Sequence, residues 1–259
     1  GLAISLGNQA LILDKKGDPN GALSLHKEEE QIYRELSDMD GLQRSLDNQA
    51  LILLDQGDLN GAAALMKETE QICRNLDNKK SLAACLGNQG LVLKERGDLA
   101  GAMALYKEQE RIYRKLGYKN GLHVSLDNQG LVLVAQGDLD GAMALHKEAE
   151  KICRELGNKK GLAACLTNQA LILKDRGDLV GAMELLKEQE RLCRELGFKQ
   201  DLDIILDNQA MIMRRQGDLK GAMTKLKEAE QISREQRNKI GLALYLGHQA
   251  VILMDQDDF

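Results

Sequence analysis

The segment that first appears as LGNQALIL recurs in seven copies, six of which carry a pair of side-chain amides. The pair is Asn8-Gln9 in the first copy and returns every 40 residues, except that His248 replaces Asn in the last copy. A side-chain amide offers a donor and an acceptor, so it can bind the N–H and C=O groups of a peptide backbone whatever the sequence of that peptide. Because amides are poor helix interiors and costly to bury, their recurrence in an apolar segment indicates a specific use.

The histidines and cysteines, which could also do chemistry, show no catalytic or metal-binding pattern. His26 and His146 share a column of the repeat with Met66 and Tyr106, which predicts core or boundary positions. No CxxC motif, Cys/His cluster or nucleophile–base arrangement occurs, and the glycines are explained by turns rather than by a phosphate-binding loop. We therefore expect no enzyme activity within this chain, no metal and no cofactor.

The cysteines and the overall charge indicate the setting. Cys73, Cys153 and Cys193 alternate with Tyr and Ser in one column, as Cys85 and Cys165 do in another, which predicts reduced thiols in half-buried packing and a cytoplasmic, intracellular location. A net charge of −5 argues against nucleic acid as a partner. No apolar run approaches the roughly 20 residues that span a bilayer, and residues 1–15 are already repeat sequence, so we expect neither a membrane span nor a signal peptide in this chain.

The elements that must position these residues follow from the repeat. A fixed period of 40 residues is typical of a stacked-repeat protein. In the copy over residues 81–120, the apolar positions Leu82, Leu86 and Leu93 predict an amphipathic first helix. Gly97-Asp98 then predicts a turn and an N-cap, followed by a second helix over residues 99–116. We predict a single array over 1–259, with helix pairs at 1–40, 41–80, 81–120, 121–160, 161–200 and 201–240 and a final first helix within 241–259.

This unit resembles a tetratricopeptide repeat (TPR) over the whole chain. The large and small apolar positions of that family and its Gly-Asp pair between the helices are all matched. The matching residues are Leu86, Gly90, Leu93, Gly97-Asp98, Ala102 and Tyr106. The Leu-x-Asn-x-Ala-Leu-x-Leu form is similar to kinesin light chain repeats, and the 40-residue period with a longer second helix is similar to the partner-of-Inscuteable group. The resemblance implies an all-α, right-handed superhelical α-solenoid. It also implies that the concave face holds an extended peptide or a helix.

The Gln of each pair departs from the family pattern, which has a large apolar residue there. It falls inside the core stripe, where an unpaired amide costs about 1–3 kcal/mol, so it must be hydrogen-bonded. The polar residues late in the second helix of the same unit are the expected partners: Glu29, Thr69, Gln109 and Gln189. A binding channel reached by the Gln side chains is the alternative.

The Asn of each pair lies 100° further around the helix, off the core stripe. The resemblance implies that this column faces the concave surface and binds the backbone of a partner through Asn8, Asn48, Asn88, Asn128, Asn168 and Asn208. Two alternatives stay open: recent duplication copied the Asn, or the column is an amide ladder between repeats. The TPR group that binds a C-terminal carboxylate has Lys just before this Asn, and the chain has Gly, Asp or Thr there, so that ligand is not expected.

Two further sets of residues complete the predicted groove. Leu91, Leu131 and Leu171 can accept apolar side chains of a partner, or can pack between repeats. Lys174 and Arg214, with Arg176 and Arg215, make the later half basic and favour acidic residues in a partner there. We therefore expect a protein-interaction module. The alternative is a structural spacer or scaffold in a larger protein, or end-to-end self-association, because neither Leu2–Leu13 nor Leu246–Leu253 has the polar face of a cap.

Overall fold

The computed structural model describes residues 1–197 and 199–257, with side chains described except at 199, 200 and 257. These residues form thirteen α-helices and no strand. The first helices of the pairs are α1 Leu2–Lys15, α3 Met39–Asp55, α5 Lys79–Glu95, α7 Lys119–Gln136, α9 Lys159–Asp175, α11 Lys199–Arg215 and the final α13 Lys239–Asp257. The second helices are α2 Pro19–Glu35, α4 Leu59–Asn75, α6 Leu99–Leu116, α8 Leu139–Leu156, α10 Leu179–Leu196 and α12 Leu219–Gln236. The predicted α-solenoid of helix pairs is confirmed.

The turns within the pairs follow from the repeated Gly-Asp. Gly97 has φ +81°, a left-handed conformation that suits glycine and ends α5. Asp98 then caps α6, because its side chain accepts a hydrogen bond of 2.9 Å from the N–H of Gly101. All of the remaining second helices begin with the same aspartate cap.

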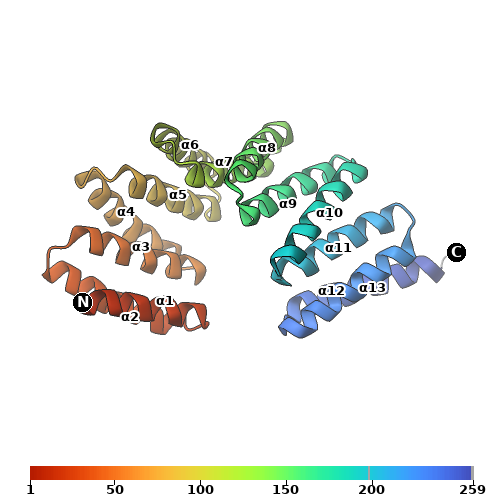
Figure 1. Ribbon diagram of the computed structural model, residues 1–259, viewed down its shortest axis with the longest axis horizontal. Coiled ribbons are helices and arrows are strands. Elements are labelled where there is room, and N and C mark those ends of the chain that lie inside the picture. The colour runs from red at the N-terminus through yellow and green to blue at the C-terminus, as the bar shows by residue number, and fades with distance from the viewer. Residues whose placement is uncertain (198, 258–259) are drawn as a thin grey trace. The chain divides into compact units, whose positions relative to one another are not determined.

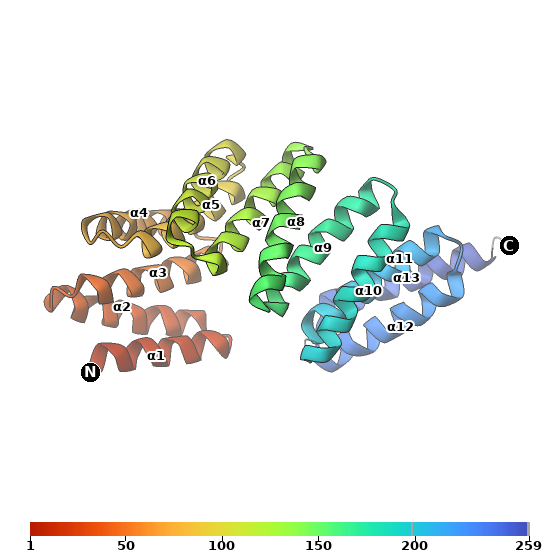
Figure 2. The same ribbon diagram turned by 45° about the horizontal axis from the view of Figure 1, so that its top comes forward.

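The helices group into two compact units, Gly1–Gly137 and Asp138–Phe259. In the first unit, each of α2, α4 and α6 packs against its own first helix and against the first helix of the next pair. In the second unit, α10 and α12 pack in the same way, and α8 packs on α9. Figures 1 and 2 let the reader follow this succession within each unit. The arrangement of both units as a single array stays a prediction.

The core of each unit lies where first and second helices meet. In the first unit it includes the fully buried Leu46, Ala50 and Met66, and in the second Leu206 and Leu226. All five cysteines are buried free thiols, more enclosed than the half-buried positions that we predicted. Burial raises the pKa of the Cys73 thiol to about 11, so this sulfur stays protonated at neutral pH. His26 and His146 are also fully buried, as the repeat pattern predicted.

Candidate functional site: the two amide columns of the first helices

The Gln column bonds to the second helix of the preceding pair. Gln89 Nε2 on α5 donates to Glu70 Oε2 on α4 over 2.8 Å, and Gln209 Nε2 on α11 donates to Glu190 Oε2 on α10 over the same distance. The equivalent bonds join Gln49 to Glu30, Gln129 to Glu110, Gln169 to Glu150 and Gln249 to Glu230. The Gln column is thus hydrogen-bonded, as expected, but it links successive pairs rather than the two helices of one pair.

The partners that we predicted for the Gln column were wrong. Glu29 Oε2 instead lies within hydrogen-bond distance of His26 Nδ1, at 2.7 Å, and Gln189 Nε2 donates to Thr167 Oγ1 over 2.5 Å. The physical reason is direction: each Gln of the second and later pairs reaches back to the preceding second helix, whereas these residues face the first helix of their own pair. The sequence did contain a signal for the true partner, because a Glu recurs 19 residues before every one of these Gln residues.

Each of these glutamates also accepts from an arginine one turn later. Arg74 Nε donates to Glu70 Oε1 over 2.8 Å, so one carboxylate joins Arg74 and Gln89. Burial acts to raise the pKa of Glu70, but the hydrogen bonds from Gln89 and Arg74 lower it below its ordinary value. Some arginines reach further, as Arg34 does to Glu68 over 2.7 Å on the next second helix. These Gln–Glu–Arg networks assign the Gln column a structural role.

The Asn column of the first unit has free amides. Asn48, Asn88 and Asn128 lie half-buried at the same place on α3, α5 and α7, and Asn8 is exposed on α1. None of these four side chains forms a hydrogen bond with any residue that the structure describes. Half-buried amides that lack an internal partner are suited to bind the backbone of another chain.

The Asn column of the second unit is already engaged. Asn208 Nδ2 donates to the carbonyl of Ile204 over 3.1 Å, and Asn208 Oδ1 accepts from Lys174 Nζ over 3.2 Å. Asn168 also has a partner within the chain. Where the last copy has His248, its Nδ1 lies 2.6 Å from Asp207 Oδ1. The column therefore forms internal contacts in the second unit that it does not form in the first.

Two clefts lie beside the amide columns. In the second unit, a cleft of about 310 Å³ between α9 and α11 is lined by Asn168, Asn208, Thr167 and Ile204, among others. In the first unit, a cleft of about 490 Å³ between α3 and α5 is lined by Leu91 with residues such as Leu54, Leu59 and Glu95. Each cleft offers apolar surface on the first helices, next to polar groups.

The leucine column is only partly covered by the fold. Leu91 and Leu131 are half-buried, and Leu171 is exposed at 36 %. In the first unit, Leu91 is near enough to the core to pack against the cluster around Tyr106. The two interpretations of this column, packing and binding, thus apply together at Leu91, while Leu171 offers exposed apolar surface.

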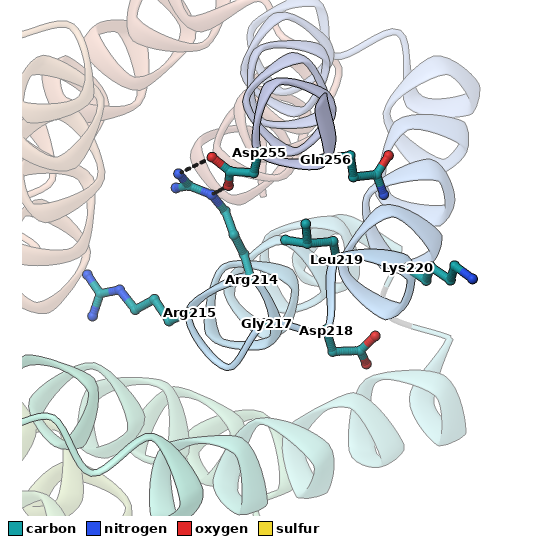
Figure 3. A pocket seen from close by; sticks show the side chains of 8 residues that line it. All are labelled: Arg214, Arg215, Gly217, Asp218, Leu219, Lys220, Asp255 and Gln256. Atoms are coloured by element: carbon teal, nitrogen blue, oxygen red, sulfur yellow. Dashed lines mark hydrogen bonds and ion pairs between the residues drawn. The ribbon is translucent and has the colours of Figure 1, made fainter. Parts of the chain in front are cut away.

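Two of the four basic residues predicted for the groove are paired with acids of the same unit. Figure 3 shows the pocket, about 940 Å³, at the ends of α11 and α13. The Arg214 guanidinium there points to Asp255, with Nε 2.5 Å from Oδ2. Arg176 is likewise paired with Asp140 over 2.5 Å, whereas Arg215 points away from Asp255 and has no ion-pair partner in the described part of the chain. The positive charge available to a partner is smaller than the sequence indicates.

Among the residues that the structure describes, no group of three or more His, Cys, Asp or Glu side chains is placed to hold a metal ion. None of the helices there combines the length and the apolar character needed to cross a membrane.

Comparisons with solved structures agree with this architecture. The signal transduction ATPase with a tetratricopeptide repeat sensor, PH0952 from Pyrococcus horikoshii, is 15 % identical with a TM-score of 0.79, over 98 % of this chain and 39 % of that one. The nearly identical TPR-like repeats of a putative kinesin light chain from Podosopora anserina are 17 % identical with a TM-score of 0.60, over 74 % and 95 %. A Rap protein complexed with Competence and Sporulation Factor is 12 % identical with a TM-score of 0.72, over 98 % and 75 %. At these identities the similarity shows the fold alone.

The sequence itself identifies the family. No curated protein matches the chain. The family described as the MalT-like TPR region matches residues 13–257, which is nearly the whole chain and includes all six helix pairs from the end of α1 onward. The TPR resemblance of the repeats is therefore confirmed, and the protein belongs to the family of the MalT-like TPR region.

Proposed function

We propose that this protein is an interaction module that binds an extended peptide or a helix along the Asn-bearing face of its first helices, without catalysis. The observation that carries the proposal is a set of three half-buried amides, Asn48, Asn88 and Asn128, on consecutive first helices of one unit, which have no hydrogen-bond partner among the described residues. A row of amides at equal sequence spacing suits a ligand whose own polar groups recur, which is the property of a peptide backbone.

The energetics favour use of these amides over chance retention. Asn is less favourable than Ala in a helix by roughly 0.6 kcal/mol, so three such residues without internal bonds weaken the fold slightly. Each hydrogen bond that they form to a partner contributes about 0.5–1.5 kcal/mol net. Apolar contact with Leu91 and Leu131, which lie one turn further along α5 and α7, adds to this. Together these contributions suffice for a specific contact of moderate strength.

The solved structures of similar fold support the proposal without carrying it. The Rap protein structure contains a bound Competence and Sporulation Factor. The repeats of the Pyrococcus horikoshii protein are described as a sensor. Both descriptions are those of folds that recognise another molecule, which is the role that we propose for this chain.

Self-association is a second candidate, and the exposed apolar residues of α1 favour it. Leu2, Ile4 and Ile12 are more than half exposed on a helix that has no preceding pair among the described residues. Sedimentation or light scattering over a range of concentrations tests this candidate. A mass that stays monomeric at all concentrations would exclude it.

Selection from a displayed library of random 12-residue peptides tests the proposed function. The unaltered protein should enrich peptides that then bind in solution, and the Asn48→Ala/Asn88→Ala/Asn128→Ala protein should bind them at least tenfold more weakly. The matched control replaces two exposed residues of the second helices in the same unit, Gln31 and Gln71, by alanine. Equal binding by all three proteins would overturn the proposal. A sharp fall in Tm of the Asn variant would instead assign the column a structural role.

A further inference from the structure

A cleft of about 300 Å³ lies between α4, α5 and the C-terminal half of α6 in the first unit, and most of its charged lining residues are basic. We call it the basic cleft. The charged residues that line it are Arg74 on α4, Lys79 on α5, and Glu108, Arg111 and Lys115 on α6. The apolar residues that line it are the buried Leu82 and Ile112 and the exposed Leu116. The basic cleft shares no residue with the Asn-bearing face.

At three other places in the chain, an ion pair joins consecutive second helices where the basic cleft has none. Arg154 donates from Nη1 and Nη2 to the two carboxylate oxygens of Glu188, over 2.9 and 3.1 Å. The other two ion pairs are Arg34–Glu68 over 2.7 Å and Arg194–Glu228 over 2.6 Å. Each of these arginines also binds the glutamate four residues earlier on its own helix, so each guanidinium holds two carboxylates.

Arg74 holds only one carboxylate. It binds Glu70 on its own helix over 2.7 Å, but no hydrogen bond or ion pair within the described part of the chain joins it to Glu108, which has the place of Glu188 in the repeat. Glu108 instead lies 3.9 Å from Arg111. The Arg74 guanidinium therefore keeps N–H donors at the basic cleft that no described acid accepts. In the equivalent arginines, the group that such donors bind is a carboxylate.

Lys115 distinguishes the basic cleft in the sequence. Its column holds an acid or an amide in every other second helix, namely Glu35, Asn75, Glu155, Glu195 and Glu235. In the second unit, Arg191 contacts Glu195 of this column over 3.9 Å. In the first unit, Arg111 has Lys115 at that place and contacts Glu108 instead. Lys115 itself has no acidic partner among the residues that the structure describes.

We infer that the basic cleft binds an acidic segment of a partner protein. One carboxylate of that segment would accept from the unused donors of Arg74 and Lys115, and an adjacent apolar side chain would lie against Leu82 and Ile112. The carboxylate would thereby take the part that Glu188 has for Arg154 in the second unit. The inference concerns a different surface from the Asn-bearing face, so it does not depend on the proposed function.

The charges of the molecule favour this partner. The whole chain has a net charge of −5, so an acidic segment is repelled by most of the protein and attracted by the basic cleft, which fixes where it binds. Lys79 is already paired with Asp77 over 2.5 Å, which leaves Arg74 and Lys115 as the groups with donors to spare. Arginine matches a carboxylate with two parallel N–H donors.

The apolar lining favours a peptide over a small inorganic anion. An anion such as phosphate would use the basic side chains but would leave the surface of Leu82, Ile112 and Leu116 uncovered. The volume of the cleft is at the lower end of the range for ligand pockets, which suits a single side chain better than a whole cofactor. A peptide with an apolar residue among acids uses both kinds of surface.

Binding of a labelled peptide, with one leucine between two blocks of three glutamates, tests this inference. Fluorescence anisotropy with the whole chain measures its affinity. Lys115→Glu should bind the peptide at least tenfold more weakly, and the fold should tolerate it because four other second helices have Glu in this column. Lys115→Asn, which copies Asn75, should give a smaller loss. Lys15→Glu is the matched control: it makes the same charge change at an exposed site in the last turn of α1, and should change the affinity less than twofold.

Two competitors separate a peptide from a simple anion. A peptide with glycine in place of the leucine should bind several-fold more weakly, and inorganic phosphate should displace the labelled peptide no better than chloride at the same ionic strength. The inference is overturned if the labelled peptide does not bind at about 1 mM, or if Lys115→Glu and Lys15→Glu weaken it equally. Equal binding of the glycine peptide, or displacement by phosphate alone, would show an anion site and contradict the inference. Loss of binding only in the Asn48/Asn88/Asn128 variant would place the peptide on the Asn-bearing face and would also contradict it.

Discussion

The Asn-bearing faces of the two units differ although their sequences repeat. In the first unit, Asn48, Asn88 and Asn128 keep their amides free of internal bonds. In the second unit, Asn208 is held by Lys174 and by its own helix, and His248 stands where the next Asn would be. The comparison teaches that the column residue alone does not define a binding face. At Asn208, contacts from its own helix and from the pair before it together engage the amide.

The behaviour of two equivalent lysines explains part of this difference. Lys174 reaches Asn208 on the next first helix, while Lys94, at the same place in the first unit, pairs with the adjacent Glu95 over 3.5 Å. The residue after Lys174 is Asp175, whose carboxylate is one methylene shorter. The two lysines thus differ both in the residue that follows them and in the group that they contact.

The largest expected effect is on peptide binding. If it is not observed, the proposed difference between the Asn columns of the two units is wrong. Replacing Asn48, Asn88 and Asn128 with alanine should lower the affinity for a selected peptide about a hundredfold, which is about 3 kcal/mol, because three hydrogen bonds are lost. Replacing Asn168 and Asn208 should weaken it less than threefold. Titration of both variants with the same peptide measures the difference. Equal losses would show that both units bind.

A second prediction concerns two aspartates of one column, the half-buried Asp47 and the buried Asp207. Burial raises the pKa of Asp47 to about 6, against the hydrogen bond from Gln43, and no basic side chain within the described residues contacts this carboxylate. A carboxyl group with a pKa above its unfolded value of about 3.9 destabilises the fold once it is deprotonated. Asp47→Asn should therefore stabilise the protein by about 2 kcal/mol at pH 7.

The pH dependence of the stability change caused by Asp47→Asn is the control for this prediction. The destabilisation is absent below about pH 3.9, where both states are protonated, and complete above about pH 6, so the variant and the original should converge near pH 4. Asp207→Asn should give a smaller gain: burial raises the pKa of Asp207 also, but the hydrogen bond to His248 acts to lower it. Denaturant unfolding at pH 4 and pH 7 measures all three proteins. A stabilisation of Asp47→Asn that is equal at both pH values would contradict this assignment.

Restoring asparagine at the end of the column should have a moderate effect. His248→Asn removes the 2.6 Å contact with Asp207 and leaves a buried carboxylate with less support. We expect a loss of about 1 kcal/mol at pH 7, with no change in binding by the first unit. Thermal unfolding and peptide titration measure the two quantities. An unchanged Tm would mean that the Asp207–His248 contact contributes nothing to stability.

The smallest effect should come from Lys174→Met, which keeps a long unbranched side chain and removes its charge. Lys174 and Asn208 are both half-buried, so their contact contributes little and the Tm should hardly move. The amide oxygen of Asn208 would become free, as in the first unit. Peptide binding should therefore strengthen slightly, and binding weaker than that of the original would show that Lys174 itself contacts the peptide.

Much of the fold could be predicted from the sequence because the pattern of each helix and turn recurs in several copies of the repeat. The Gly-Asp turns, the apolar stripes and the buried histidines follow from local rules. The partner of Gln89 could not be predicted from its helix alone, because the choice between Gln109 of the same pair and Glu70 of the pair before depends on how pairs stack. The pairing of Arg214 with Asp255 was missed for a similar reason, since the two lie in different repeats.

The candidate site is less predictable than the fold. Sequence placed an Asn at every column position from Asn8 to Asn208, and nothing in those positions separates the free amides of one unit from the bonded amides of the other. That separation depends on long side chains such as Lys174, whose direction is set by neighbours. Local pattern therefore gave the candidates, and tertiary contacts distinguish them.

The Gln–Glu–Arg networks have a consequence for how the molecule comes apart. Most of these bonds tie a pair only to the pair beside it, so a rupture at one boundary leaves distant boundaries intact. Within each unit, loss of order should therefore spread from one pair to the pair beside it rather than appear in all pairs at once. Mechanical unfolding of a unit would then give a series of small, similar steps.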